Sequence, residues 1–123
     1  LKASIETLSI DKVLELSDFI SLHVPAQKDY VIGSKELSMM KDNSAIINAA
    51  RGGVIDEVAL VSALDSNKLA FTCLDTFENE PKPEIKLLMH PKISLTPHIG
   101  AATLEAQDRI GVELGQQIIS ILG

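Results

Sequence analysis

The chain has 123 residues, of which 46% are hydrophobic and 23% charged, a balance typical of one globular domain. Its formal net charge is −6, and its 11 basic residues are scattered among acidic ones, which argues against nucleic acid as a partner. No stretch approaches the ~20 apolar residues of a membrane-spanning helix. The lone Cys73 cannot form an internal disulfide, so we expect a reducing, cytoplasmic setting.

The first half of the chain alternates between helical and strand-like patterns. Ser9 is placed to cap a helix over residues 10–16, whose apolar residues recur at helical spacing. A continuous apolar run over residues 19–24 predicts a strand. Ser34 is then expected to cap a short helix that ends at residue 40, before a second predicted strand over residues 45–50.

The second half continues the same alternation. Asp56 is expected to cap a helix through about residue 66, and strands follow over residues 69–74 and 93–96. Residues 79–91 contain three prolines and many charges, which predicts a loop or a short irregular helix. Thr103 is expected to cap a long final helix that reaches about residue 122. Its inward-facing stripe should comprise Ala106, Ile110, Leu114, Ile118 and Ile121.

This order of elements predicts an α/β fold in which helices flank a parallel sheet. None of the four apolar runs alternates strictly between apolar and polar residues, so we expect strands that are buried on both faces. Parallel strands all end at the same edge of the sheet, and ligands bind in the crevice there. The polar residues that follow the strands should therefore converge; they include Arg51, Asp75, Glu80 and His98.

The residue types at this edge suggest chemistry, although each has a structural alternative. Arg51 precedes two glycines and could hold a carboxylate through two parallel hydrogen bonds, or form a structural ion pair. His98 could transfer a proton near neutral pH, or bond to the backbone at a helix terminus. On spacing alone, either Glu78 or Glu80 could pair with it. The clustered ligands of a metal site and the Gly-x-Ser-x-Gly elbow of a serine hydrolase are both missing from the sequence.

Four segments together resemble the D-isomer-specific 2-hydroxy-acid dehydrogenase family. Residues 17–25 are similar to its strand beside the nicotinamide, and residues 47–57 (INAARGGVIDE) to its arginine motif. Residues 74–81 (LDTFENEP) are similar to its Asp and Glu motif, and residues 95–103 (LTPHIGAAT) to its histidine motif. The four motifs occur in the family's order at compatible spacing and cover essentially the whole chain.

The resemblance implies a partial Rossmann-like parallel sheet that binds NAD. It selects Glu80 over Glu78, because the family's catalytic glutamate directly precedes a proline, and it makes His98 the acid/base. Arg51 would bind the substrate carboxylate. The residues implied to line the nicotinamide half of the NAD site are Val24, Ala49, Ala50, Arg51, Asp75, His98, Gly100 and Ala101. No metal is implied.

The sequence also departs from the family pattern. The Gly-x-Gly-x-x-Gly phosphate loop is not found in these residues, and Gly52 and Gly53 lack its spacing. We therefore expect residues 1–123 to be the C-terminal part of the NAD-binding domain, with that loop and the substrate domain contributed from upstream. Alone, this part should bind NAD weakly and show little turnover.

Of the possible substrates, 3-phosphoglycerate, used in serine biosynthesis, is favoured for the whole protein. Glyoxylate, hydroxypyruvate and D-lactate remain alternatives, because enzymes for them share the same motifs. The resemblance further implies a homodimer. An NAD-sensing, corepressor-like binding protein is the competing class, since such proteins can retain the same three side chains.

Overall fold

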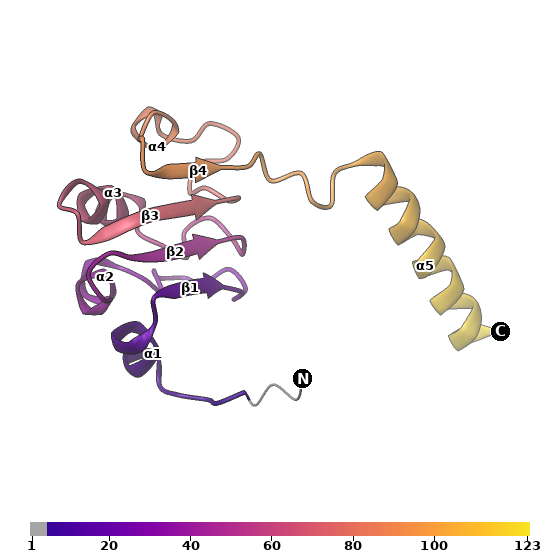
Figure 1. The fold of residues 1–123 in the computed structure, drawn as a ribbon. Coiled ribbons are helices and arrows are strands. Elements are labelled where there is room, and N and C mark those ends of the chain that lie inside the picture. Colours follow the sequence, from indigo (N-terminus) through magenta and orange to yellow (C-terminus); the bar gives the residue numbers. More distant parts are fainter. Residues whose placement is uncertain (1–4) are drawn as a thin grey trace.

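The computed structural model describes residues 5–123 and contains one four-stranded parallel sheet with the strand order β1-β2-β3-β4. The strands are β1 (Phe19–Leu22), β2 (Ser44–Asn48), β3 (Leu69–Leu74) and β4 (Ile93–Leu95). All four point the same way, so their carboxyl ends form a single edge (Figure 1). The predicted α/β fold with a parallel sheet is confirmed, and the predicted strands are one or two residues too long at three carboxyl ends.

The helices are α1 (Ile10–Leu16), α2 (Ser34–Met39), α3 (Glu57–Asp65), α4 (Ile85–Leu88) and α5 (Leu104–Leu122). Three predicted caps are confirmed, because the side chains of Ser9, Asp56 and Thr103 accept backbone N–H groups of the first turn. The cap predicted at Ser34 is wrong. Gly33 is the N-cap of α2, and its N–H donates to Glu36 at 3.0 Å, so Ser34 is already the first helical residue.

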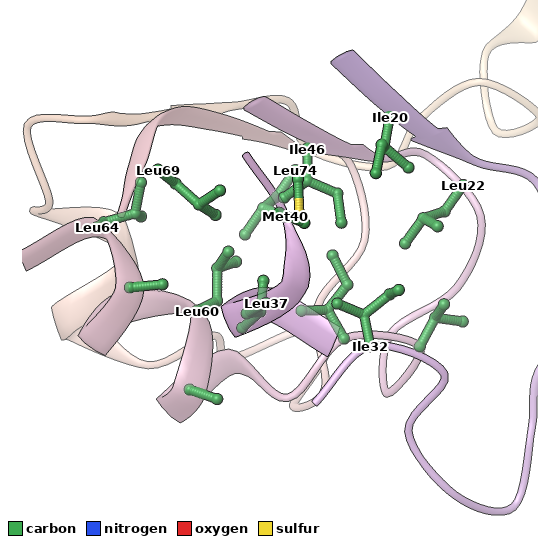
Figure 2. Packing of buried hydrophobic residues seen from close by; sticks show 14 of the residues in the cluster. Ile20, Leu22, Ile32, Leu37, Met40, Ile46, Leu60, Leu64, Leu69 and Leu74 are labelled. Carbon is green, nitrogen blue, oxygen red and sulfur yellow. The ribbon is translucent and has the colours of Figure 1, made fainter. Parts of the chain in front are cut away.

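The hydrophobic core lies between one face of the sheet and helices α2 and α3 (Figure 2). Ile20, Ile46 and Thr72 stand in register across the three longer strands and are all buried. Leu37 of α2 and Leu60 of α3 pack against this face. The Thr72 hydroxyl donates to the Ile46 carbonyl at 2.7 Å, so its polar group is satisfied inside the core.

The opposite face of the sheet is open at β1 and β3, so the prediction that the strands are buried on both faces is wrong for these two strands. Phe19 is 69% exposed, and Phe71 is 40% exposed. Their rings lie 6.4 Å apart on either side of Ala45, the residue paired with both. β1 therefore alternates between exposed and buried residues and β3 exposes Phe71, because the described helices cover only one face, whereas the central strand β2 is buried at four of its five residues.

Helix α5 stands well away from the sheet, at the end of an extended segment that follows β4 (Figure 1). None of its residues is buried within the described part of the chain. Its predicted inward stripe is therefore wrong for this structure: Ile110, Leu114, Ile118 and Ile121 are each about half to four-fifths exposed. Among the described residues no helix is both long and apolar enough to cross a membrane.

Candidate functional site

Four loops leave the carboxyl edge of the sheet, and each carries residues expected at the site. Val24 follows β1, Arg51 follows β2, Asp75 follows β3 and His98 follows β4. The β2 and β4 ends are separated only by β3. Two interstrand spacings amount to about 10 Å, so the loops that carry Arg51 and His98 begin close together along this edge.

The imidazole of His98 pairs with the carboxylate of Glu80. Its Nδ1 atom lies 2.9 Å from Oε2 and 3.0 Å from Oε1 of that residue. Both side chains are 37% exposed, so the pair is open to solvent and to a ligand. The hydrogen bond to His98 is the main cause that holds the pKa of Glu80 below its usual value, followed by a hydrogen bond from the Phe77 N–H.

This contact leaves one ring nitrogen of His98 available. Among the described residues both hydrogen bonds of the His98 ring are made by Nδ1, and Nε2 has no hydrogen-bond partner. A carboxylate on one nitrogen fixes the tautomer and directs the other nitrogen outward. The pair is therefore arranged to exchange a proton at Nε2.

Asp75 fixes the backbone that carries His98. Its Oδ1 atom accepts from the Thr96 hydroxyl at 2.5 Å and from the His98 N–H at 3.1 Å. His98 adopts a φ of 52°, a left-handed conformation that is uncommon outside glycine. Such backbone conformations persist where surrounding contacts over-determine them, and Asp75 supplies one of those contacts.

Arg51 sits on a turn that Asn48 organises. The buried Asn48 side chain accepts from the Ala50 N–H at 3.1 Å and donates to the Arg51 carbonyl at 3.0 Å. The guanidinium itself is exposed and makes one short contact, to the Ala50 carbonyl at 2.6 Å. Among the described residues it forms no ion pair, so the structural alternative considered for Arg51 is not found there.

Glycine is required directly after Arg51. A Cβ atom on Gly52 would lie 1.8 Å from the Phe77 carbonyl oxygen, far inside any allowed contact. Gly53 adopts a φ of 77°, which side chains rarely tolerate. The turn that carries Arg51 therefore packs directly against the start of the loop that carries Glu80.

Glu78 does not contact His98 but pairs with Glu57 at the start of α3. Its Oε1 accepts from the Glu57 N–H at 3.0 Å, and its own N–H donates to Glu57 Oε1 at 2.8 Å. Sequence reasoning left both glutamates open and missed Asn48 and Glu57 as parts of this edge. A polar residue at the end of an apolar strand was the available sequence signal for Asn48, whereas Glu57 resembled an ordinary first-turn acid.

Two cavities lie near this edge, and one of them adjoins the His98–Glu80 pair. One of about 420 Å³ is lined by His98 and Glu80 together with apolar side chains that include Phe77, Leu88 and Leu95. A smaller one of about 130 Å³ opens at the ends of β2, β3 and β4, between Ala49, Cys73 and Asp75. The described residues hold no group of three or more potential metal ligands.

The family model for the NAD-binding domain of D-isomer-specific 2-hydroxyacid dehydrogenases matches residues 2–100. The chain belongs to this family. The match ends just before α5 and takes in every residue of the Arg51 turn and of the His98–Glu80 pair.

Curated relatives are 36–48% identical to the chain over the aligned residues. D-3-phosphoglycerate dehydrogenase 3 of Arabidopsis thaliana is 41% identical over 96% of the chain, which spans 21% of that protein. Hydroxypyruvate reductase of Thermotoga maritima is 44% identical over 97% of the chain, which spans 40% of that protein. The chain therefore corresponds to between a fifth and two-fifths of the length of these relatives.

Solved structures of family members share the fold. A glyoxylate reductase from Paecilomyes thermophila superposes with a TM-score of 0.79 at 46% identity, covering 85% of this chain and 33% of that one. A 2-hydroxyacid dehydrogenase from Polaromonas gives a TM-score of 0.82 at 32% identity, covering 92% and 36%. The predicted Rossmann-like sheet and the predicted cofactor class, NAD, are thereby confirmed.

The carboxyl edge fits the nicotinamide end of NAD. The smaller cavity offers apolar walls, and Asp75 at its rim offers a carboxylate that can accept from a carboxamide. Of the other expected cofactor residues, Val24 is half-buried, Ala50 is buried and Ala49 is exposed directly after the strands β1 and β2. Gly100 and Ala101 are exposed in the segment that runs from β4 to α5. The 123 residues contain no Gly-x-Gly-x-x-Gly turn for the pyrophosphate.

Proposed function

We propose that residues 1–123 form the C-terminal part of the NAD-binding domain of a dehydrogenase that interconverts D-2-hydroxy acids and 2-oxo acids. The observation that carries the proposal is the 2.9 Å contact between His98 and Glu80 at the sheet edge from which Arg51 also emerges. A proton-transfer group and a carboxylate-binding group at one edge match the two ends of a 2-hydroxy acid.

In the oxidation direction His98 accepts the substrate hydroxyl proton at Nε2, and in reduction it returns that proton. Glu80 stabilises the imidazolium that forms, because its carboxylate lies against Nδ1. A positioned acid/base of this kind typically contributes ~10²- to 10⁴-fold in rate.

Arg51 binds the substrate carboxylate and orients the carbonyl toward His98. Its exposed guanidinium has donors free to form two parallel hydrogen bonds with a carboxylate. Bound NAD supplies the hydride acceptor. Asp75 and Ala49, which line the smaller cavity, would contact its nicotinamide together with Ala50.

Within this reaction class we favour 3-phosphoglycerate as the substrate. Support comes from several relatives named D-3-phosphoglycerate dehydrogenase, of which that of Methanocaldococcus jannaschii is 42% identical. Hydroxypyruvate, glyoxylate and D-lactate are the alternatives. We further propose that the whole protein is a cytoplasmic homodimer; the lone cysteine is consistent with the cytoplasmic setting.

The decisive experiment uses His98→Gln in the whole protein that contains this chain. Steady-state rates are measured with NADH and a panel of 2-oxo acids: 3-phosphohydroxypyruvate, hydroxypyruvate, glyoxylate and pyruvate. We expect turnover to fall ~10²- to 10⁴-fold while NADH still binds, because only proton transfer is lost. His90→Gln is the matched control, since His90 lies away from this edge and contacts Asp65.

Two results would count against the proposal. Unchanged turnover in His98→Gln would remove His98 from the mechanism. A wild-type protein that binds NADH but reduces no 2-oxo acid would favour a cofactor-sensing binding protein instead.

A further inference from the structure

Two glutamates join the start of α3 to the loop that follows β3. The Glu57 N–H donates to Glu78 Oε1 at 3.0 Å, and the Glu78 N–H donates to Glu57 Oε1 at 2.8 Å. Each side chain thus accepts from the other residue's backbone across 21 positions of sequence. We call this reciprocal pair of Glu57 and Glu78 the glutamate latch.

Capping of α3 accounts for only half of the latch. Glu78 Oε1 accepts from the Glu57 N–H, a first-turn donor of the helix, but the Glu78 N–H that donates to Glu57 Oε1 lies outside the helix. Asp56 already serves as the N-cap, with its side chain accepting from the Ala59 N–H at 3.0 Å. Glu57 is only 7% exposed, a high degree of burial for a carboxylate without a cationic partner among the described residues. Burial is the main cause that raises the pKa of Glu57, and the neighbouring charge of Glu78 adds to it.

The latch holds a segment that leads directly to the acid/base pair. Phe77 precedes Glu78, is itself buried, and donates its N–H to Glu80 Oε1 at 2.9 Å. The Phe77 carbonyl lies against Gly52, the residue after Arg51. Fixing the Glu78 backbone therefore fixes the donor that orients Glu80 and, through Glu80, the imidazole of His98.

We propose that Glu57 is a positioning residue for proton transfer, which acts by accepting the Glu78 N–H and so holds Glu80 against His98. This inference rests on the proposed function of the His98–Glu80 pair. It assigns Glu57 to the geometry of the site and not to contact with substrate or cofactor. Burying the Glu57 carboxylate costs stability, and in return the loop after β3 is held in one conformation, as is common at functional sites.

The test compares Glu57→Ala with Glu57→Gln in the whole protein. The alanine variant removes the acceptor, and we expect kcat to fall about 10- to 100-fold with an unchanged KM for NADH, as for small misplacements of catalytic groups. The glutamine variant keeps a side-chain oxygen at the same position and should recover most of the lost kcat. Ala63→Gly is the matched control: it lies in the same helix, is also buried, and costs about 1 kcal/mol in helix stability.

A second readout reports on His98 directly. In ¹⁵N-histidine-labelled protein, the ring nitrogens of His98, assigned by their loss in His98→Gln, report the hydrogen bond at Nδ1. We expect these resonances to move in Glu57→Ala and to stay in place in Ala63→Gly. If Glu57→Ala does not fold, Glu57→Asp serves instead, because its shorter side chain withdraws the acceptor without removing the charge.

The outcomes separate this inference from the proposed function. If His98→Gln is inactive and Glu57→Ala matches Ala63→Gly in kcat and in its His98 resonances, Glu57 has a structural role only and the inference is wrong. If Glu57→Gln is as impaired as Glu57→Ala, the acceptor role is wrong. If His98→Gln retains full activity, the proposed function itself fails.

Discussion

At the scale of single residues, the His98 imidazole owes its orientation to two different carboxylates. Asp75 binds the His98 backbone N–H, while Glu80 binds ring nitrogen Nδ1. The backbone is thus held by one strand end and the ring by the loop beyond it. This division leaves the ring free to pair with Glu80 while the left-handed backbone conformation is maintained by Asp75.

The Arg51 side chain makes fewer hydrogen bonds than His98, which suits the carboxylate-binding role proposed for it. Its backbone carbonyl is bound by Asn48, but its guanidinium contacts only the carbonyl of the preceding residue among the described groups. The turn is therefore ordered by the protein, whereas the charged end has most of its donors available to a substrate carboxylate.

Arg51→Lys in the whole protein should raise the KM for the 2-oxo acid about 10- to 100-fold, because lysine cannot make the two-pronged contact, and charged hydrogen bonds are worth about 1.5–3 kcal/mol. KM for NADH should change little. Initial-rate kinetics with both substrates varied measure the two constants separately. A substrate KM that stays at its wild-type value would exclude Arg51 as the carboxylate-binding group.

At the scale of secondary-structure elements, the site depends on loops from neighbouring strands that pack against one another. The β2 turn meets the β3 loop where Gly52 contacts the Phe77 carbonyl. The β3 loop is held to α3 by Glu57 and Glu78, and the β4 loop is held to β3 through Asp75. Each loop is therefore fixed by the element next to it.

Gly52→Ala should disrupt this packing, since its Cβ would lie 1.8 Å from the Phe77 carbonyl oxygen. Overpacking of this kind costs typically about 1–3 kcal/mol, or more where backbone must move. Gly53→Ala is the informative comparison: its φ of 77° makes it strained, but nothing lies within 4 Å of its Cβ position. Urea unfolding of both variants should show the larger loss of stability for Gly52→Ala, and equal losses would mean that the close approach is not important.

At the scale of the whole molecule, the chain presents apolar surfaces that the described residues leave uncovered. Phe19 and Phe71 mark the open face of the sheet, and α5 carries exposed isoleucines and leucines along its length. Large uncovered apolar patches mark interaction surfaces in proteins. The relatives are about two and a half to five times as long as the chain, and we propose that further parts of a longer polypeptide cover these surfaces.

The 123-residue chain alone should bind NADH only weakly, with a Kd above the micromolar range. The nicotinamide edge is present, but the glycine-rich turn that cradles a pyrophosphate does not occur in these residues. Isothermal titration calorimetry of the isolated chain, with the whole protein as the positive control, measures the difference. Micromolar binding by the isolated chain would show that the carboxyl edge suffices for the cofactor.

Features that depend on neighbours in sequence could be predicted without coordinates. The caps at Ser9, Asp56 and Thr103, the strand β3 and the order of elements follow from local hydrogen bonding and from apolar spacing. The polar residues after each strand could be assigned to one edge, because parallel strands share their direction. Resemblance to the family added the choice of Glu80 and the roles expected of Arg51 and His98.

Other features were decided only by tertiary structure, since they join residues that are distant in sequence. Glu78 and Glu80 are indistinguishable by type and spacing, but chain folding brings Glu80 to His98 and Glu78 to the start of α3. Continuous apolar runs indicated burial on both faces, yet burial depends on which helices pack where, and α5 packs against neither face. The sequence determines which residues are apolar and can be buried. Only the packing of helices against the sheet decides which of those residues are buried.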